Sequence, residues 1–127
     1  MPLFVLSVGQ CGFDDSRLAR LLHDHCQAVL ESADSAPHAR RMLAEKPYAL
    51  LLANRIFDAD GDSGASLIGT LRASGSTIPM MLVSDYPDAQ QAAIAQGALP
   101  GFGKSQLNSP ATAALLRTVL TAPNPTG

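Results

Sequence analysis

Short apolar runs alternate along the chain with stretches in which apolar residues recur every three or four positions. Residues 3–8 and 48–53 are the most continuous of the apolar runs. A continuous run of this length is typical of a strand that is covered on both faces. Weaker runs of the same kind occur elsewhere in the chain. The five predicted strands are residues 3–8, 27–32, 48–53, 78–83 and 98–102.

Amphipathic helices are predicted between and after these runs. Leu18, Leu21 and Leu22 have the spacing i, i+3, i+4, which places them on one face of a helix. The cluster at residues 13–16 is expected to cap the start of this helix. Further helices are predicted at residues 35–45, 63–73 and 88–96, and after the cap at residues 108–110. The last helix is expected to turn Ala114, Leu115, Leu116 and Val119 toward the core.

The strict alternation of five strands with five helices predicts an α/β fold of three layers. In such a fold the strands form a parallel sheet, and right-handed crossovers place helices on both of its faces. Sites in these folds lie at the carboxyl ends of the strands, where polar residues gather. The residues at these ends are Gly9, Gln10 and Cys11; Asn54 and Arg55; Ser84 and Asp85; and Gly103, Lys104 and Ser105.

The composition fits one globular domain, predicted to span residues 1–122, followed by a disordered tail at residues 123–127. Hydrophobic residues make up 46% of the chain and charged residues 16%, which is enough apolar material for a core. The net charge is −2 and the sequence shows no basic patch, so nucleic-acid binding is not expected. Cys11 and Cys26 lack the spacing of a metal site and are expected to be buried free thiols. The N-terminus has neither a signal peptide nor a membrane-spanning run, so a cytoplasmic location without membrane contact is expected.

Length, alternation and the strand-end residues together resemble the receiver domain of two-component response regulators, over residues 3–121. The spacing of Asn54 and Ser84 and the segment GASLIGTLR are also similar to the family's pattern. The resemblance implies a flavodoxin-like five-stranded parallel sheet with strand order 2-1-3-4-5, flanked by five helices. It also implies a role in signal transduction by phosphorelay.

The positions that carry the family's chemistry are altered in this sequence. In receivers, an aspartate at the end of the third strand is phosphorylated, and two acidic residues after the first strand help to hold Mg²⁺. Here Asn54 falls at the acceptor position, and Gly9 and Gln10 fall near the acidic pair, whereas Ser84 and Lys104 match the family's hydroxyl residue and lysine. A carboxamide is a poor nucleophile, and Mg²⁺ prefers carboxylate oxygens. The resemblance with these departures predicts a degenerate receiver, or pseudo-receiver, that is not an enzyme and holds no metal or cofactor.

Other acidic residues leave alternatives open. Asp14 and Asp15 either cap the first helix, where the helix dipole favours them, or belong to the acidic pocket in a shifted alignment. Asp58 or Asp14 as a displaced acceptor would make the chain a phosphorylatable receiver. A binder of small ligands at the strand ends is a third interpretation, because the same fold supports it. The candidate partners of Lys104 are Asn54, Asp85 and Asp14.

The resemblance also implies a surface for partners. In receivers, partners commonly dock on the face formed by the fourth helix, the fifth strand and the fifth helix. A protein partner is therefore expected there, and a second copy of the chain, giving a homodimer, is an alternative. The fourth helix has few charges, which favours contact. Phe102 stands where the family's switch aromatic usually lies, and an ordinary core position is the other interpretation. The expected face includes Gln90, Gln91, Ile94, Phe102 and the outer side of residues 111–121.

Overall fold

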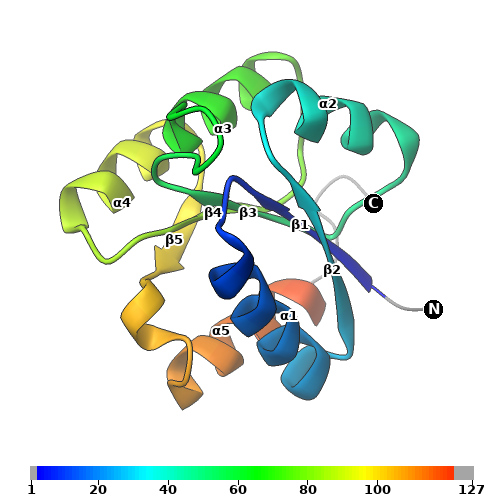
Figure 1. Cartoon of the computed structure of the whole chain (residues 1–127), viewed down its shortest axis with the longest axis vertical. Helices are drawn as coiled ribbons and strands as arrows, with labels where there is room; N and C mark the ends of the chain where they lie inside the picture. Colours follow the sequence, from blue (N-terminus) through cyan, green and yellow to red (C-terminus); the bar gives the residue numbers. More distant parts are fainter. Residues whose placement is uncertain (1–2, 122–127) are drawn as a thin grey trace.

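A computed structural model of the chain describes residues 3–121, which form a five-stranded parallel sheet with helices on both faces (Figure 1). The strand order is β2-β1-β3-β4-β5, so the predicted fold class is confirmed. The strands are β1 Leu3–Val8, β2 Ala28–Ala33, β3 Leu50–Asn54, β4 Met80–Val83 and β5 Leu99–Phe102. The helices are α1 Gly12–Cys26, α2 Ala36–Glu45, α3 Gly64–Ala73, α4 Pro87–Ala95 and α5 Pro110–Thr121, with a short 3₁₀ helix η1 at Lys104–Gln106.

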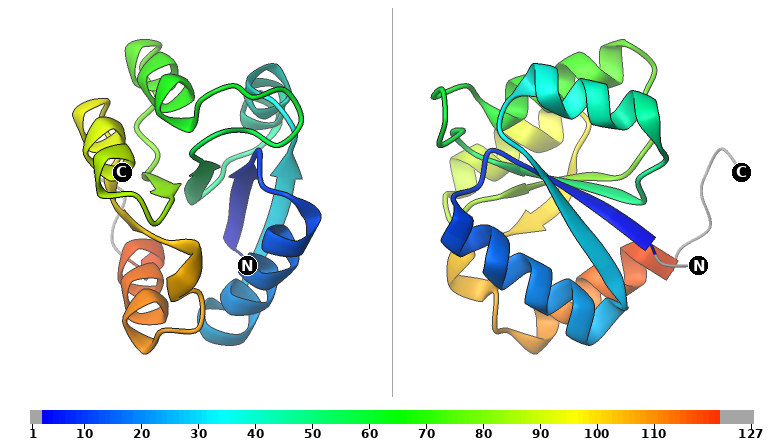
Figure 2. Two further views of the ribbon diagram at one scale, coloured as in Figure 1. Left: turned by 60° about the vertical axis from the view of Figure 1, so that its left-hand side comes forward. Right: turned by 45° about the vertical axis from the view of Figure 1, so that its right-hand side comes forward.

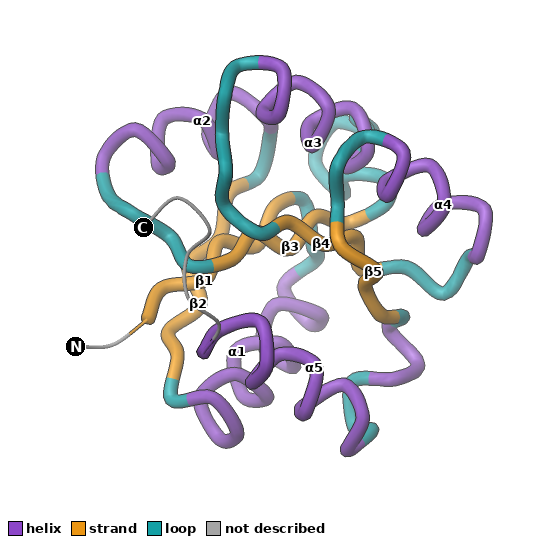
Figure 3. Tube along the Cα trace, turned by 180° about the vertical axis from the view of Figure 1, so that it is seen from behind, coloured by secondary structure: helices purple, strands orange, loops and turns teal. Residues whose placement is uncertain are grey.

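The sheet is the middle of three layers, with α2, α3 and α4 on one face and α1 and α5 on the other (Figures 2 and 3). Successive side chains of a strand point to opposite faces. Leu51 therefore lies in the core under α2–α4, whereas Leu50 and Leu52 lie in the core under α1 and α5. Both faces need apolar residues, which explains why the strands read as continuous apolar runs.

The parallel register brings the carboxyl ends of the strands to one edge of the sheet. Val8 at the end of β1 pairs with Ala33 of β2 and Ala53 of β3. Asn54, the last residue of β3, pairs with Val83 at the end of β4. The segments that follow these strands are therefore neighbours, and they form the candidate site.

The buried face of α5 agrees with the predicted one in part. Leu116 is buried, and Leu115 and Val119 pack against the core, whereas Ala114 is exposed. Apolar residues occur on almost every side of this helix, so periodicity alone admits two stripes about one residue apart, and packing against α1 and the sheet selects one. The residues that α5 buries are Thr112, Ala113, Leu116 and Leu120.

The start of α1 also differs, because the cluster at residues 13–16 does not cap it. The N-cap residue is Cys11, and its side chain makes no capping hydrogen bond. Asp14 and Asp15 lie in the first turn of the helix, but they bond to residues of other segments, as described below. The predicted tail at residues 123–127 lies outside the described residues. Between residues 3 and 121, no helix is both long and apolar enough to cross a membrane.

Candidate functional site

Asn54 ends β3 at the centre of the strand-end edge, and its side-chain amide is fully engaged. Its Nδ2 donates to the carbonyl oxygens of Gly9 at 3.1 Å and Ile56 at 2.7 Å. Its Oδ1 accepts from the backbone N–H of Arg55 at 3.0 Å. Only 9% of Asn54 is exposed. An ionised aspartate has no donor and would face two carbonyl oxygens here, so the surrounding backbone fits an amide and not a carboxylate.

Gly9, at the position near the family's acidic pair, leaves no space for a side chain. Its φ is +76°, in the left-handed region that L side chains rarely adopt. A Cβ at this position would overlap the ring of Phe57, which is 1% exposed and belongs to the core under α2–α4. The Gly9 carbonyl accepts from Asn54 and from the backbone N–H of Asp58 at 3.0 Å. An acidic side chain at position 9 would thus need both a strained backbone and a displaced ring.

Gln10 follows Gly9 and is 8% exposed, yet neither atom of its side-chain amide has a hydrogen-bond partner among the described residues. A buried, unpaired amide costs about 1–3 kcal/mol of stability. Among the described residues, Gln10 therefore adds no side-chain hydrogen bond to this edge.

Lys104 pairs with Asp14 across a distance of 2.8 Å between Nζ and Oδ2. Of its three candidate partners, Asp14 is the one that the structure shows. Burial raises the pKa of the Asp14 carboxyl, but hydrogen bonds from Lys104 and the Cys11 thiol and the positive charges of Lys104 and Arg17 outweigh it. The pKa consequently lies below its usual value. The lysine is neutralised by a carboxylate from α1 instead of one from β3.

The neighbouring Asp15 is held separately. Its Oδ1 accepts from the hydroxyl of Ser7 at 2.6 Å, and Ser7 is fully buried in β1. Asp14 and Asp15 thus serve as local partners for a lysine and a buried hydroxyl. The interactions of the two carboxylates are therefore these bonds, and neither side chain caps α1.

Ser84 and Asp85, at the end of β4, are also occupied by local bonds. The Ser84 Oγ is buried and accepts from the backbone N–H of Tyr86 at 3.1 Å. Asp85 accepts from the hydroxyl of Ser105 at 2.6 Å and from its backbone N–H, which ties the β4 end to η1. A Cβ at Gly103 would overlap this carboxylate, so the close approach requires glycine there.

Asp58 lies exposed on the loop between β3 and α3. Asp60 and Asp62 of the same loop accept hydrogen bonds from the loop's own backbone. Across residues 3–121, no three His, Cys, Asp or Glu side chains lie close enough together to hold a metal ion. The absence of a metal, and the role of Asp58 as a displaced acceptor, remain predictions.

Two residues of the expected partner face are turned inward. Phe102 is 4% exposed and lies in the core under α1 and α5, on the opposite side of the sheet from α4. The amide of Gln90 donates to the carbonyl oxygens of Leu82 at 2.9 Å and Ser84 at 3.0 Å, and it accepts from the backbone N–H of Gly101 at 3.1 Å. Gln90 thus bridges the shifted register between β4 and β5. Phe102 thus has the core position that was one of its two interpretations. Gln90 is partly buried, and Gln91 and Ile94 are exposed.

Sequence reasoning missed Phe57 and the internal role of Gln90. Phe57 had a signal: it is an isolated aromatic residue in an otherwise polar loop three positions after Asn54. Gln90 had no such signal, because its three partners lie in β4, just after β4 and in β5.

Solved structures, receiver domains among them, share this fold. A putative response regulator from Chloroflexus aurantiacus is 16% identical, with a TM-score of 0.75, over 96% of this chain and 100% of that one. The beryllofluoride-activated NtrC4 receiver domain dimer is 16% identical, with a TM-score of 0.73, over 93% and 98% of the two chains. NtrX from Brucella abortus is 17% identical, with a TM-score of 0.69, over 94% of this chain and 29% of its own.

This chain therefore spans less than a third of the length of NtrX. No family model and no curated protein matches the sequence. At these identities the likeness establishes the receiver fold, and function must be argued from the site.

Proposed function

We propose that this chain is a degenerate receiver domain, which acts in signalling as a phosphorylation-independent protein-interaction module and not as an enzyme. The observation that carries the proposal is the amide of Asn54, whose nitrogen donates to the carbonyl oxygens of Gly9 and Ile56. The backbone around the acceptor position is arranged for a donor, which a phosphorylatable aspartate cannot be when ionised.

Two further features support this proposal. The ring of Phe57 occupies the space that a side chain at position 9 would need. The ammonium of Lys104 is paired with Asp14 and is not left to neutralise a phosphoryl group on β3. A site without carboxylates at positions 9, 10 and 54 also lacks the ligands that Mg²⁺ prefers.

The partner is a protein. The structural relative NtrC4 is described as a receiver domain dimer, so a second copy of this chain is one such partner. On the face of α4, β5 and α5, the exposed residues Gln91 and Ile94 are available for contact. A cytoplasmic location is part of the same proposal.

Incubation with acetyl phosphate and Mg²⁺, followed by intact mass measurement, tests the proposal. We expect no gain of a phosphoryl group, while a receiver domain with a complete acidic pocket gains one under the same conditions. A stoichiometric adduct on this chain would overturn the proposal.

A phosphorylatable receiver that uses a displaced aspartate is the second candidate. The observation that favours it is the position of Asp58, which is exposed and whose backbone N–H is bonded to Gly9 at the strand-end edge. If an adduct forms, the variants Asp58→Asn and Asp14→Asn identify the acceptor, because only the true acceptor's variant loses the adduct.

A further inference from the structure

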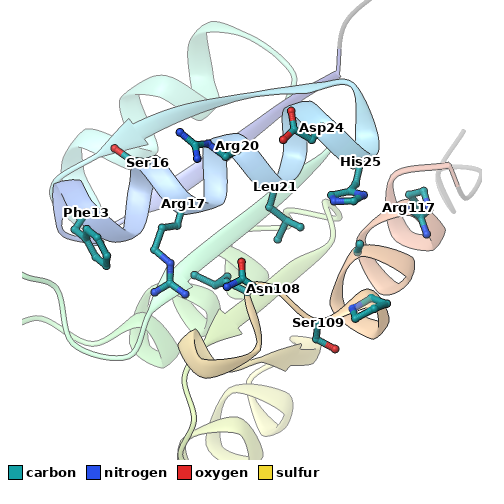
Figure 4. Close-up of a pocket in the computed structure, with 13 residues that line it drawn as sticks. Phe13, Ser16, Arg17, Arg20, Leu21, Asp24, His25, Asn108, Ser109 and Arg117 are labelled. Atoms are coloured by element: carbon teal, nitrogen blue, oxygen red, sulfur yellow. The ribbon is translucent and has the colours of Figure 1, made fainter.

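Two recesses on opposite faces of the sheet differ in how they present positive charge. The recess between α1 and α5 has a volume of about 660 Å³, and its arginines, Arg17, Arg20 and Arg117, point in different directions (Figure 4). They therefore do not define one anionic site. A recess of about 520 Å³ lies between the starts of α3 and α4, and we call it the α3–α4 pocket. Its basic residue, Arg55, lies beside an exposed aromatic ring.

The floor of the α3–α4 pocket is apolar. Leu82 of β4 is 1% exposed, and Ala65 and Ala89 are partly buried and pack against the core under α2–α4. Ala92 of α4 also lines the pocket. Alanines on both helices leave room that larger side chains would fill. Sites for small molecules have volumes of roughly 300–1,000 Å³ and are lined mainly by apolar side chains, so this pocket has the size and the lining of such a site.

The rim of the pocket combines an aromatic ring, an aliphatic side chain and a cation. Tyr86 is 60% exposed and Ile56 is 41% exposed. The guanidinium of Arg55 lies 4.8 Å from the centre of the Tyr86 ring, and it forms no ion pair with any residue between 3 and 121. A guanidinium stacked on a ring still has N–H groups at its edge, and these can bind a carboxylate through two parallel hydrogen bonds.

The backbone that carries this rim is held in place by side chains of the strand-end edge. The amide of Asn54 accepts from the N–H of Arg55 at 3.0 Å and donates to the carbonyl of Ile56 at 2.7 Å. The N–H of Tyr86 donates to the hydroxyl of Ser84 at 3.1 Å. A rim that is fixed before binding loses little conformational entropy when a ligand binds.

We propose that the α3–α4 pocket binds a small aromatic monocarboxylate. The carboxylate pairs with Arg55, and the aromatic ring lies on the alanine floor between Ile56 and Tyr86. Asp88 also lines the pocket, and its charge disfavours a second anionic group on the ligand. This inference goes beyond the proposed function and does not rest on it, because the pocket does not include the acceptor position.

Other occupants fit the pocket less well. A free phosphate needs several cations or converging backbone amides, whereas the pocket offers one arginine over an apolar floor. A partner protein on the face of α4, β5 and α5 would contact Gln91 and Ile94, and neither residue lines the pocket. A ring with one carboxylate matches both the apolar floor and the single cation.

The experiment titrates the ¹⁵N-labelled chain with naphthoate, with its neutral analogue naphthamide and with acetate. We expect naphthoate to shift the backbone amide signals of Arg55 and Ile56 and the side-chain amide signal of Asn54. Naphthamide should bind about fivefold more weakly, because it lacks the anion. Acetate should give no saturable shift, because it has no ring to cover the floor.

Arg55→Gln tests the cation. This exposed substitution should weaken naphthoate binding about fivefold and leave naphthamide binding unchanged, so the preference for the anion should disappear. Arg41→Gln, at an exposed position of α2, is the matched control and should bind both probes as the wild type does.

Ala92→Leu tests the pocket itself. The larger side chain should occupy the floor and abolish the binding of both naphthoate and naphthamide. Ala95→Leu, which is also exposed on α4 but does not line the pocket, should leave the binding of both probes unchanged. Thermal unfolding of each variant separates lost binding from lost folding.

Several outcomes would overturn the inference: no saturable shift at about 5 mM naphthoate, equal binding of naphthamide, or shifts confined to α1 and α5. Tighter binding of a capped peptide that contains Phe and Glu, or a concentration-dependent dimer that shifts the same signals, would also overturn it, because the occupant would then be a protein. The acetyl phosphate experiment above is independent of these results, so either proposal can fail alone.

Discussion

The side-chain amide of Asn54 donates to the backbone carbonyl of Gly9 at 3.1 Å, and this bond joins the end of β3 to the end of β1. The same nitrogen donates to Ile56 at 2.7 Å. The strand-end edge therefore depends on a hydrogen-bond donor at position 54.

Asn54→Asp should destabilise the chain by about 1–3 kcal/mol at pH 7, because a carboxylate would face two carbonyl oxygens. That environment should raise the pKa of the new carboxyl group. The folded state then binds its proton more tightly than the unfolded state, so the loss should shrink as the pH falls toward 4. Urea unfolding at several pH values measures this effect. Asp58→Asn, at an exposed position, is the control and should change stability by less than about 0.5 kcal/mol.

Gly9→Ala should cost about 1–3 kcal/mol, from strain at a φ of +76° and from overlap with the ring of Phe57. Phe57→Ala should cost about 3–5 kcal/mol as a buried aromatic truncation. The double variant should be more stable than the sum of the two losses predicts, because the smaller residue 57 makes room for the new methyl group. Strict additivity in denaturant unfolding would show that the two positions do not interact.

Asp14→Asn should lower stability at pH 7 by about 1 kcal/mol, by removing the anion that pairs with Lys104. Because the pKa of Asp14 is lower in the folded state than in the unfolded state, the pair contributes fully above the unfolded pKa near 3.9. The contribution is lost as the pH falls through the folded value. The difference between wild type and variant should therefore vanish in acid, which urea unfolding at several pH values measures.

Gln90→Ala and Gln91→Ala should differ sharply despite their adjacent positions. Gln90→Ala leaves the carbonyl oxygen of Leu82 and the amide N–H of Gly101 without their side-chain partner, and should cost about 1–3 kcal/mol. The side chain of Gln91 is exposed, so its truncation should change stability by less than about 0.5 kcal/mol. Thermal unfolding of both variants compares them. Equal losses would show that the bridge between β4 and β5 is unimportant.

The fold could be predicted from the sequence because it depends on alternation, which is a local pattern. Continuous runs such as residues 48–53 and the leucine spacing of α1 define the type of each element within a few residues. The buried face of α5 could not be predicted in the same way, since its apolar residues surround the helix. Tertiary packing selected Ala113 over Ala114.

The sequence predicted where the candidate site lies but not which bonds its residues make. Sites of parallel α/β sheets lie at the carboxyl ends of the strands, which placed Asn54, Ser84 and Lys104 at one edge of the sheet. Their bonds depend on partners from distant segments, such as Asp14 for Lys104, and periodicity carries no information about those.

The ring of Phe57 beside Gly9 makes the residue types at these two positions depend on each other. A carboxylate introduced at position 9 alone meets an aromatic wall, and removal of the wall alone opens a hole in the core. Either change alone should therefore cost stability. A side chain at position 9 is compatible with the core only together with a matching substitution at position 57.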